Sequence, residues 1–390
     1  MEPSSRVVAF CRELVRIESL SGHEQDVADA VEREMLALGY DAVGRDDLGS
    51  VVGVLRGGDS AAAAGAPAAL LFDAHMDVVP ATEPDAWRFP PFSGERADGR
   101  VWGRGATDVK GSLAALVVGL GTLPRADRRG TVVVAATVGE ERIEGLATTH
   151  VLRQHPAAAA VICEPTGLAL GLGHRGRASL VVEAAGRAAH TSRAETGINA
   201  VYRLVEAIER IRGLAPRTDA LLERGHCELV EVSSQPFPGS SMVPFHASAR
   251  FDRRLVRGET SEGVLAEVRS ALADLEGVTV HLHQGELRCY TGCCFTVEAF
   301  HPGWAVGADA PIARRAREAL EVTGLPHGVF YAPYSTNATA TAGRFGLPTL
   351  VYGAGSIEAA HAVDESVAED ELLAAARGYR ALARGLAGGL

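Results

Sequence analysis

Four short runs of apolar residues, several of them rich in β-branched side chains, each lead into residues of the kind that bind metal ions. The runs and the residues beyond them are 69–72 before His75, 131–134 before Glu140 and Glu141, 160–163 before Glu164, and 349–352 before His361. Runs of this length, bounded by Gly and Pro, are typical of buried strands. Ligands of an open α/β sheet gather just beyond the carboxyl ends of its strands. With Asp108 on an intervening loop, the pattern predicts an α/β metalloenzyme.

The bulk properties of the chain exclude several classes of protein. At 390 residues the chain is too long for one small core, so two domains are expected. The net charge of -11 argues against a nucleic-acid partner. No stretch is apolar enough to span a membrane and the start lacks an export signal, so we expect a cytoplasmic protein with reduced cysteines and no membrane partner. The Ala-rich stretch 61–67 is expected to be a surface loop.

The order of the expected elements indicates one domain inserted into another. Helical patterns over 111–120 and 142–154 alternate with the apolar runs, which is typical of an α/β sheet. Beyond residue 176 the expected elements are strands over 179–183, 228–232, 246–251 and 278–282, with helices over 198–211 and 260–275. Their order, β-α-β-β-α-β, is that of a compact ferredoxin-like domain. We therefore predict a catalytic domain of residues 1–176 and 291–390, interrupted by an inserted domain of residues 177–290.

A smaller signal precedes the second helix. Ser21 is followed three residues later by Glu24, which matches the capping box that begins many helices.

The candidate ligands suit a pair of divalent ions. Such a pair needs one shared carboxylate and two further ligands on each ion, which leaves a position open for water. The sequence supplies five candidates, namely His75, Asp108, Glu141, Glu164 and His361. Glu140, beside a ligand, is placed to deprotonate the attacking water and pass its proton to the leaving amine. Asp77 is a candidate acceptor for an imidazole N–H and so orients the ring.

Each of these residues has an ordinary explanation when taken alone. A His-x-Asp sequence is more often structural, two adjacent glutamates usually lie on a solvated helix face, and His361 alone resembles a surface or capping histidine. The prediction rests on their joint order, with each residue after a strand or at a helix start.

The same residues carry a resemblance to a known family. The motifs are HMDVVP at 75–80, GRGATDVKG at 103–111, GEE at 139–141 and EPT at 164–166. In combination they resemble the di-zinc metallopeptidase family of aminoacylase, acetylornithine deacetylase, succinyl-diaminopimelate desuccinylase and glutamate carboxypeptidase, over nearly the whole chain. The resemblance implies a zinc-peptidase-like catalytic domain, with two zinc ions for which cobalt or manganese could substitute.

The resemblance also implies a role for each ligand. Asp108 would bridge the two zinc ions, and a cis peptide bond would follow it. His75 and Glu164 would complete one site, with Glu141 and His361 completing the other. Glu140 would be the general base.

The inserted domain resembles the lid and dimerisation domain of that family. The match is GRAAHTS at 186–192 followed by GINA at 197–200. It implies that His190 reaches an active site, often that of the partner in a homodimer, and stabilises the oxyanion. Asp252-Arg253-Arg254 matches an Asp-x-Arg motif whose arginine binds a substrate carboxylate, which makes Arg254 a candidate substrate ligand.

Several positions depart from the commoner family pattern. Gly139 stands where many members have Asp, and Ser241 stands where many have Asn. Around Asn337, a candidate substrate-binding residue, Ser-Thr-Asn-Ala replaces the more usual Asp-containing loop. These features resemble most closely the branch of selenium-metabolism-linked hydrolases, whose name does not fix a substrate.

Together with the resemblance, the residues favour hydrolysis of an amide bond in a small carboxylate-bearing molecule, of the N-acyl-amino-acid deacylase type. A dipeptidase or carboxypeptidase of the same family is the alternative. Two further classes are a metal-dependent binding protein without catalysis, which the presence of Glu140 opposes, and a thiol-dependent hydrolase using Cys163 or the Cys293–Cys294 pair. Because Cys163 lies in an expected buried strand, packing is its simpler role.

Overall fold

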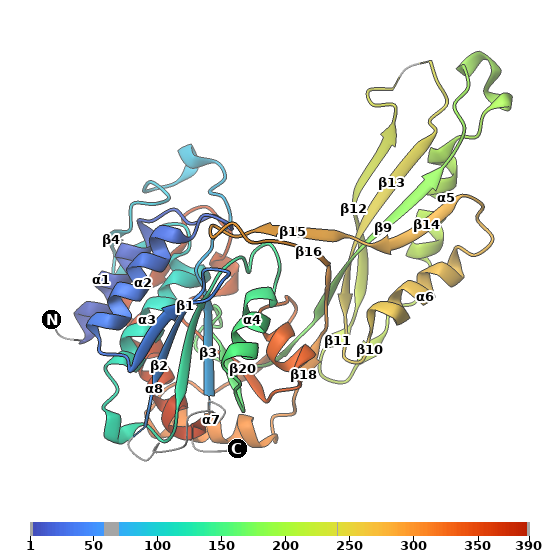
Figure 1. Ribbon diagram of the computed structural model, residues 1–390. Helices are drawn as coiled ribbons and strands as arrows, with labels where there is room; N and C mark the ends of the chain where they lie inside the picture. Colours follow the sequence, from blue (N-terminus) through green and yellow to red (C-terminus); the bar gives the residue numbers. More distant parts are fainter. Residues whose placement is uncertain (1–2, 58–69, 240, 388–390) are drawn as a thin grey trace.

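The computed structural model describes residues 3–57, 70–239 and 241–387, and it confirms the predicted α/β fold with an inserted domain (Figure 1). The Ala-rich stretch 61–67, expected as a loop, and residue 69 of the first apolar run lie outside the described residues. Within the described ranges, no helix has the length and apolar character that crossing a membrane requires. All six cysteines are free thiols.

A nine-stranded mixed sheet forms the centre of the catalytic part, in the order β1-β2-β6-β3-β7-β20-β8-β18 with β19 paired to β8. Its strands are β1 (Ala42–Arg45), β2 (Val51–Leu55), β3 (Leu70–His75), β6 (Val132–Thr137), β7 (Ala160–Ile162), β8 (Leu170–His174), β18 (Trp304–Ala305), β19 (Val329–Ala332) and β20 (Thr349–Val351). The four strands β6, β3, β7 and β20 are neighbours and run parallel. These are the four predicted strands. Because they run parallel, the residues beyond their carboxyl ends meet at one edge of the sheet.

Both faces of this sheet are covered, as its alternating side chains require. Leu70 and Phe72 join the main core, whereas Leu71 between them joins a smaller core on the other face. The main core packs under α1 (Pro3–Val15), α2 (Gln25–Ala37), α3 (Gly111–Gly121), α7 (Pro311–Val322) and α8 (Glu369–Leu386). The smaller core packs under α4 (Leu146–Gln154).

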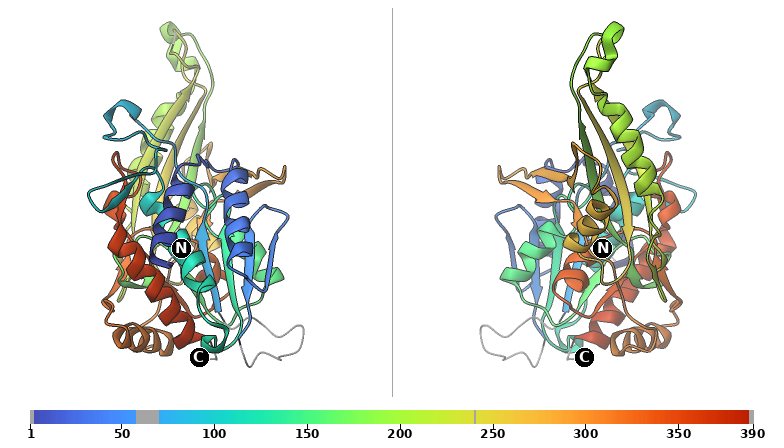
Figure 2. Two further views of the ribbon diagram at one scale, coloured as in Figure 1. Left: turned by 90° about the vertical axis from the view of Figure 1, so that its left-hand side faces the viewer. Right: turned by 90° about the vertical axis from the view of Figure 1, so that its right-hand side faces the viewer.

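The inserted domain has the predicted order β-α-β-β-α-β. Its elements are β9 (Gly176–Ala185), α5 (Ala200–Arg212), β12 (His226–Gln235), β13 (His246–Leu255), α6 (Ser261–Ala271) and β14 (Val278–Leu282). The sheet order β12-β13-β9-β14 is antiparallel throughout. Alternate residues of β13, such as Ala249 and Phe251, are buried in the core that this sheet shares with α5 and α6. The domain projects from the catalytic part as a narrow arm (Figures 1 and 2), and we call it the lid.

A hairpin returns from the lid across the catalytic part (Figure 1). It consists of β15 (Gln284–Arg288) and β16 (Cys294–Glu298). At its tip, the Tyr290 hydroxyl donates to the Gly49 carbonyl at 2.7 Å and the Thr291 hydroxyl donates to the Asp47 carbonyl at 2.8 Å. The hairpin therefore spans the domain boundary predicted at 290/291. This boundary and the one predicted at 176/177 stay predictions.

Two local predictions differ from the structure. The helix expected from residue 142 begins at Leu146, because residues 139–145 form a turn that ends in left-handed Gly145 at φ 73°. The capping box expected at Ser21 and Glu24 is absent, since the Ser21 hydroxyl donates to Asp77 and Glu24 accepts the amide N–H of Gly22.

Candidate metal centre

The structure brings the five candidate ligands together at the carboxyl edge of the parallel strands. His75 is the last residue of β3, Glu141 follows β6, and Glu164 follows β7. His361 lies in the loop beyond β20, just after η6 (Ile357–Ala359). Asp108 lies in η2 (Ala106–Lys110), directly before α3, and its peptide bond to Val109 is cis, as the family resemblance implied.

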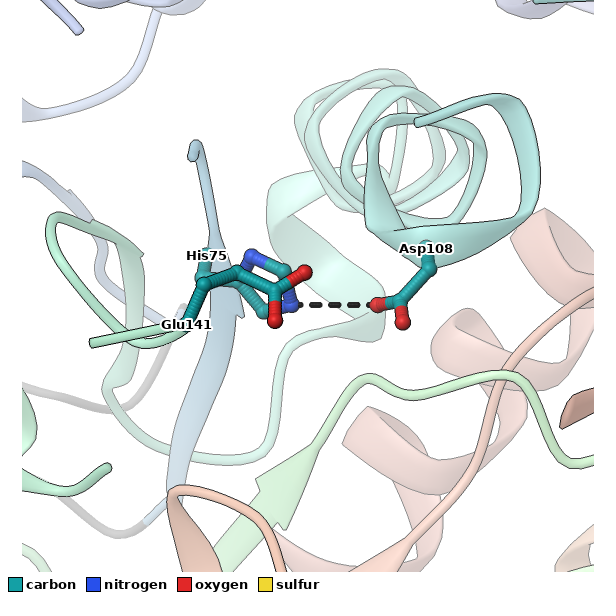
Figure 3. A group of neighbouring side chains, drawn as sticks. All are labelled: His75, Asp108 and Glu141. Carbon is teal, nitrogen blue, oxygen red and sulfur yellow. Dashed lines mark hydrogen bonds and ion pairs between the residues drawn. The ribbon is translucent and has the colours of Figure 1, made fainter. Parts of the chain in front are cut away.

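Asp108 lies between the two histidines. Its Oδ1 is 3.2 Å from Nε2 of His75, and its Oδ2 is 3.3 Å from Nε2 of His361 (Figure 3 shows the first contact). Nε2 of His361 is also 3.0 Å from Oε1 of Glu141. One carboxylate that presents a separate oxygen to each imidazole has the arrangement of a ligand shared by two ions.

The donor set fits divalent cations. Ligand atoms of His75, Asp108 and Glu141 all lie within 4.8 Å of one another. Glu140 and Glu164 each place an oxygen 4.0 Å from Nε2 of His75. Imidazole nitrogens together with carboxylate oxygens suit zinc, and they also accept cobalt or manganese. The expected division of ligands between two ions stays a prediction, since Glu141 approaches both histidines.

The site concentrates buried negative charge. Burial and the neighbouring carboxylates raise the pKa of Glu140 and of Glu164 well above its ordinary value. Burial acts to lower the pKa of His75, but hydrogen bonds to Asp108 and Asp77 outweigh it and raise that pKa well above the ordinary value. Hydrogen bonds to Asp108 and Glu141 raise the pKa of His361 to about 10. Carboxylates crowded in this way call for compensating positive charge, which divalent cations provide.

Asp77 contacts His75 and the backbone of Glu140 and Glu141. Its backbone carbonyl is 2.9 Å from Nδ1 of His75, and its carboxylate is 3.5 Å from the same nitrogen. That carboxylate also accepts the Ser21 hydroxyl at 2.6 Å and the backbone N–H groups of Glu140 and Glu141 at 3.0 and 3.1 Å. Burial acts to raise the pKa of Asp77, yet the bonds from His75 and Ser21 keep it below its ordinary value. Asp77 thus orients both the imidazole and the turn of the two glutamates.

Sequence reasoning missed the pair that holds Asp108. Oε1 of Glu365 accepts the backbone N–H groups of Thr107 and Asp108, each at 2.9 Å. Its Oε2 pairs with fully buried Arg104 at 2.6 Å, and Arg104 also donates to the carbonyl of His361 at 3.4 Å. The signal available in the sequence was the position of Glu365, four residues beyond a candidate ligand.

His190 belongs to the lid and not to the sheet edge that carries the five ligands. It is exposed, and its Nδ1 accepts the backbone N–H of Ser192 at 3.1 Å. It directly precedes η4 (Thr191–Thr196), which lies at the far tip of the lid arm (Figures 1 and 2).

The two candidate substrate ligands have different surroundings. Arg254 lies on β13 of the lid, where its Nε pairs with Asp252 at 2.9 Å. Asn337 is buried in the catalytic part. Its Oδ1 accepts the Gly145 N–H at 2.7 Å, and its Nδ2 donates to Thr137 at 3.2 Å. Substrate binding by Asn337 stays a prediction, and its observed bonds suit the positioning of the loop before α4.

Comparison with known proteins identifies a family of metal-dependent peptidases, in agreement with the candidate metal ligands. A family model described as peptidase family M20/M25/M40 matches residues 71–385. The chain belongs to this family. The family expected from the motifs is thereby confirmed, and the protein is a hydrolase of the metallopeptidase type that acts on amide or peptide bonds.

Three relatives illustrate the match. The uncharacterized protein YgeY of Escherichia coli (strain K12) is 29% identical over 96% of this chain and 92% of its own length. A succinyl-diaminopimelate desuccinylase of Paracoccus denitrificans is 31% identical over 53% of this chain and 58% of its own length. The crystal structure of the YXEP protein of Bacillus subtilis, a dinuclear metal-binding peptidase of the M20 family, covers 98% of both chains with a TM-score of 0.68 and 15% identity. That last likeness shows the shared fold.

Proposed function

We propose that the protein hydrolyses an amide bond in a small carboxylate-bearing substrate, as an N-acyl-amino-acid deacylase does, with two zinc ions at the candidate metal centre. The single observation that carries the proposal is the placement of Asp108 between His75 and His361, with Glu140 beside them. The dinuclear site of the YXEP protein and the desuccinylase activity of the Paracoccus relative support it.

In this proposal the residues divide the work of hydrolysis. When bound, the ions polarise the scissile carbonyl and lower the pKa of the attacking water. Five side chains would hold them, namely those of His75, Asp108, Glu141, Glu164 and His361. Glu140 accepts the proton of the attacking water and returns it to the leaving amine. Asp77, through its bonds to the backbone of both glutamates, keeps that base in reach.

The lid supplies the remaining groups. Arg254 binds the substrate carboxylate through its guanidinium. In a homodimer, His190 donates a hydrogen bond to the oxyanion that forms on the substrate in the active site of the partner subunit. A partner is required because η4 lies at the lid tip, away from the metal centre of its own chain (Figure 1). The lid also exposes apolar side chains on α5 and on edge strand β12, which suits a protein interface. They are Tyr202, Val205, Val230 and Val232.

Three alternative functions differ from the proposal in the bond that is cleaved or in the groups that act on it. A dipeptidase or carboxypeptidase would use the same groups on a peptide bond. A binding protein has no use for Glu140. A thiol hydrolase using Cys163 is disfavoured, because Cys163 is fully buried and burial raises the pKa of its thiol well above the ordinary value. One that uses the Cys293–Cys294 pair, of which Cys294 is exposed, is distinguished by its sensitivity to thiol alkylation.

A substrate panel tests the proposal. Zinc-loaded protein is assayed on N-acyl amino acids and on matched dipeptides, with and without a chelator. We expect faster hydrolysis of acyl amino acids, loss of activity with the chelator, and recovery with zinc. Glu140→Gln should lower kcat by about 10²- to 10⁴-fold while zinc binding, measured by calorimetry, persists. Hydrolysis that survives the chelator but not thiol alkylation would overturn the proposal.

A further inference from the structure

Four charged side chains form a continuous path of ion pairs from the lid to the turn that carries Glu140 and Glu141. The path, which we call the ionic relay, consists of Arg254, Asp252, Arg177 and Glu144. The first two lie on β13, Arg177 lies on β9, and Glu144 lies in the turn 139–145, which we call the catalytic turn. The relay therefore joins the inserted domain to the catalytic domain.

Asp252 is the shared member of the relay. Its Oδ1 is 2.9 Å from Nε of Arg254, and its Oδ2 is 2.8 Å from Nε of Arg177. Nη1 of Arg177 is in turn 3.5 Å from Oε1 of Glu144. A second carboxylate that binds Arg254 competes with Asp252 for that guanidinium. We infer that Asp252 would then interact more strongly with Arg177, which would weaken the contact of Arg177 with Glu144.

The Glu144 end of the relay is buried, and within the described part of the chain one of its carboxylate oxygens lacks a hydrogen bond. The Glu144 side chain is only 14% exposed, and its Oε2 lies 3.9 Å from Nδ1 of His301, beyond hydrogen-bond length. Both atoms are buried, and neither has a hydrogen-bond partner among the described residues. His301, on β17 (Phe300–His301), is the register partner of Arg177 on β9. A small displacement of these two strands therefore makes or breaks contacts of Glu144.

The opposite end of the catalytic turn is fixed. The Gly139 N–H donates to Oε1 of Glu24 at 3.0 Å, and Leu287 of the hairpin covers Gly139 so closely that a Cβ there would lie 2.4 Å from its Cδ2. Asp77 accepts the next two backbone N–H groups. The end of the turn is held as well, because the Gly145 N–H donates to Asn337 at 2.7 Å. Between these anchors, the Glu144 side chain contacts Arg177 of the lid.

We propose that Glu144 is a positioning residue that, through the ionic relay, couples capture of a substrate carboxylate by Arg254 to the placement of Glu140 and Glu141. The inference rests on the proposed function for the identity of the substrate. The substrate carboxylate then has two effects. Its contact with Arg254 stabilises the enzyme–substrate complex, and it also favours the arrangement of the catalytic turn in which Glu140 and Glu141 act.

Kinetics on paired substrates test the relay. An N-acyl amino acid is compared with its carboxamide, which lacks the charge. In the wild-type protein we expect the carboxylate to lower KM and to raise kcat. In Glu144→Gln the KM advantage should persist, because Arg254 is intact, while the kcat advantage falls about tenfold. A purely structural role of Glu144 would lower kcat equally for both substrates, and that result would overturn the relay.

Matched variants sharpen the test. Arg177→Gln should reproduce the loss of kcat advantage seen in Glu144→Gln, and the double variant should show no larger loss of that advantage than either single one. The KM of Arg177→Gln is expected to rise, because Asp252 then pairs only with Arg254. Arg177→Lys, which keeps the cation, should retain part of the kcat advantage. Glu276→Gln breaks an exposed lid pair with Arg203 and should change neither parameter.

A measurement that does not use the rate of hydrolysis separates the relay from the proposed function. Hydrogen exchange of peptides covering 139–145 is followed as the acyl amino acid or its carboxamide is added. The carboxylate alone should alter exchange in the wild-type protein and fail to do so in Glu144→Gln, although calorimetry shows that it still binds. Unchanged exchange in the wild-type protein would overturn the relay even if hydrolysis is found. Absence of hydrolysis with the expected exchange would overturn only the proposed function.

Discussion

At the scale of single residues, the position of Asp108 depends on a carboxylate that binds no metal in our scheme. Glu365 accepts two consecutive backbone N–H groups at Asp108 and is itself held by buried Arg104. A carboxylate that accepts both bonds and faces a guanidinium fixes the backbone that presents the shared ligand.

Glu365→Gln should weaken metal binding without touching a ligand. The amide oxygen of glutamine can still accept both backbone N–H bonds, but its NH2 group then faces Arg104. In the flipped orientation the NH2 group faces the two backbone donors instead. We expect zinc affinity to fall by about 10- to 100-fold, measured by competition with a chromogenic chelator. The control is Glu369→Gln, which removes an exposed pair with Arg96. Equal affinity in both variants would show that Glu365 does not support the site.

His174 makes a separate prediction about stability and pH. It is fully buried beside Trp304, and burial lowers its pKa from 6.5 to about 4. Between those values the unfolded chain binds a proton that the folded chain does not. Stability therefore falls as pH drops from about 6.5 toward 4, by about 3 kcal/mol from this residue.

Urea unfolding at pH 7 and pH 5 measures the effect. His174→Gln should lose less stability between the two values than the wild-type protein, whatever its stability at pH 7. His226→Gln, at an exposed position of β12, is the control and should follow the wild-type protein. A His174→Gln slope as steep as that of the wild-type protein would contradict the prediction.

How far single residues could be predicted depends on what each one bonds to. The order along the chain indicated that the ligands converge, because His75 ends a strand and Glu141, Glu164 and His361 follow strands. Glu365 bonds to backbone N–H groups and leaves no such pattern. For Asn337 the sequence indicated a loop near the substrate, but not the bonds to Gly145 and Thr137 that occupy its amide.

At the scale of elements, the hairpin β15–β16 explains why Gly139 departs from the commoner family residue. Gly139 has φ 68°, which Asp tolerates better than most residues do. The space that an aspartate would need is taken by Leu287. Oε1 of Glu24, which accepts the Gly139 N–H, would also repel a second carboxylate nearby.

Gly139→Asp should therefore destabilise the protein and disturb the catalytic turn. We expect a loss of about 1–3 kcal/mol in the free energy of unfolding, as for other overpacked sites. Adding Leu287→Ala creates room, so the double variant should lose less than the sum of the two single losses in urea unfolding. Strict additivity would mean that Leu287 does not exclude a side chain at position 139.

Helices and strands could be predicted from the sequence where the spacing of apolar residues determines them. The four buried strands and the β-α-β-β-α-β order follow from apolar runs and alternation that the sheets require. The start of α4 was misplaced, because apolar spacing continues through a turn that only the conformation of Gly145 ends. Ser21 fitted a cap, but its partner Asp77 is distant in sequence and competes for the hydroxyl.

At the scale of the whole molecule, the arm shape of the lid separates His190 from the metal centre that its own chain builds. The segment that follows His190 forms the tip of the arm, whereas the five ligands lie at the sheet edge of the catalytic part (Figure 1). Chain order could not reveal this distance. It follows from the length of β9 and β13, ten residues each, which carry the tip outward.

Mixed dimers should show whether His190 acts across subunits. Glu140→Gln and His190→Ala chains are each expected to be inactive alone. In a heterodimer, the His190→Ala chain keeps its base and receives the histidine of the Glu140→Gln chain, so one of two sites works. Random reassortment gives heterodimers in half of the molecules, and hence about a quarter of wild-type activity, if the protein is a two-fold dimer. If His190 served its own chain, no site in any mixed dimer would hold both groups, and mixing would restore nothing.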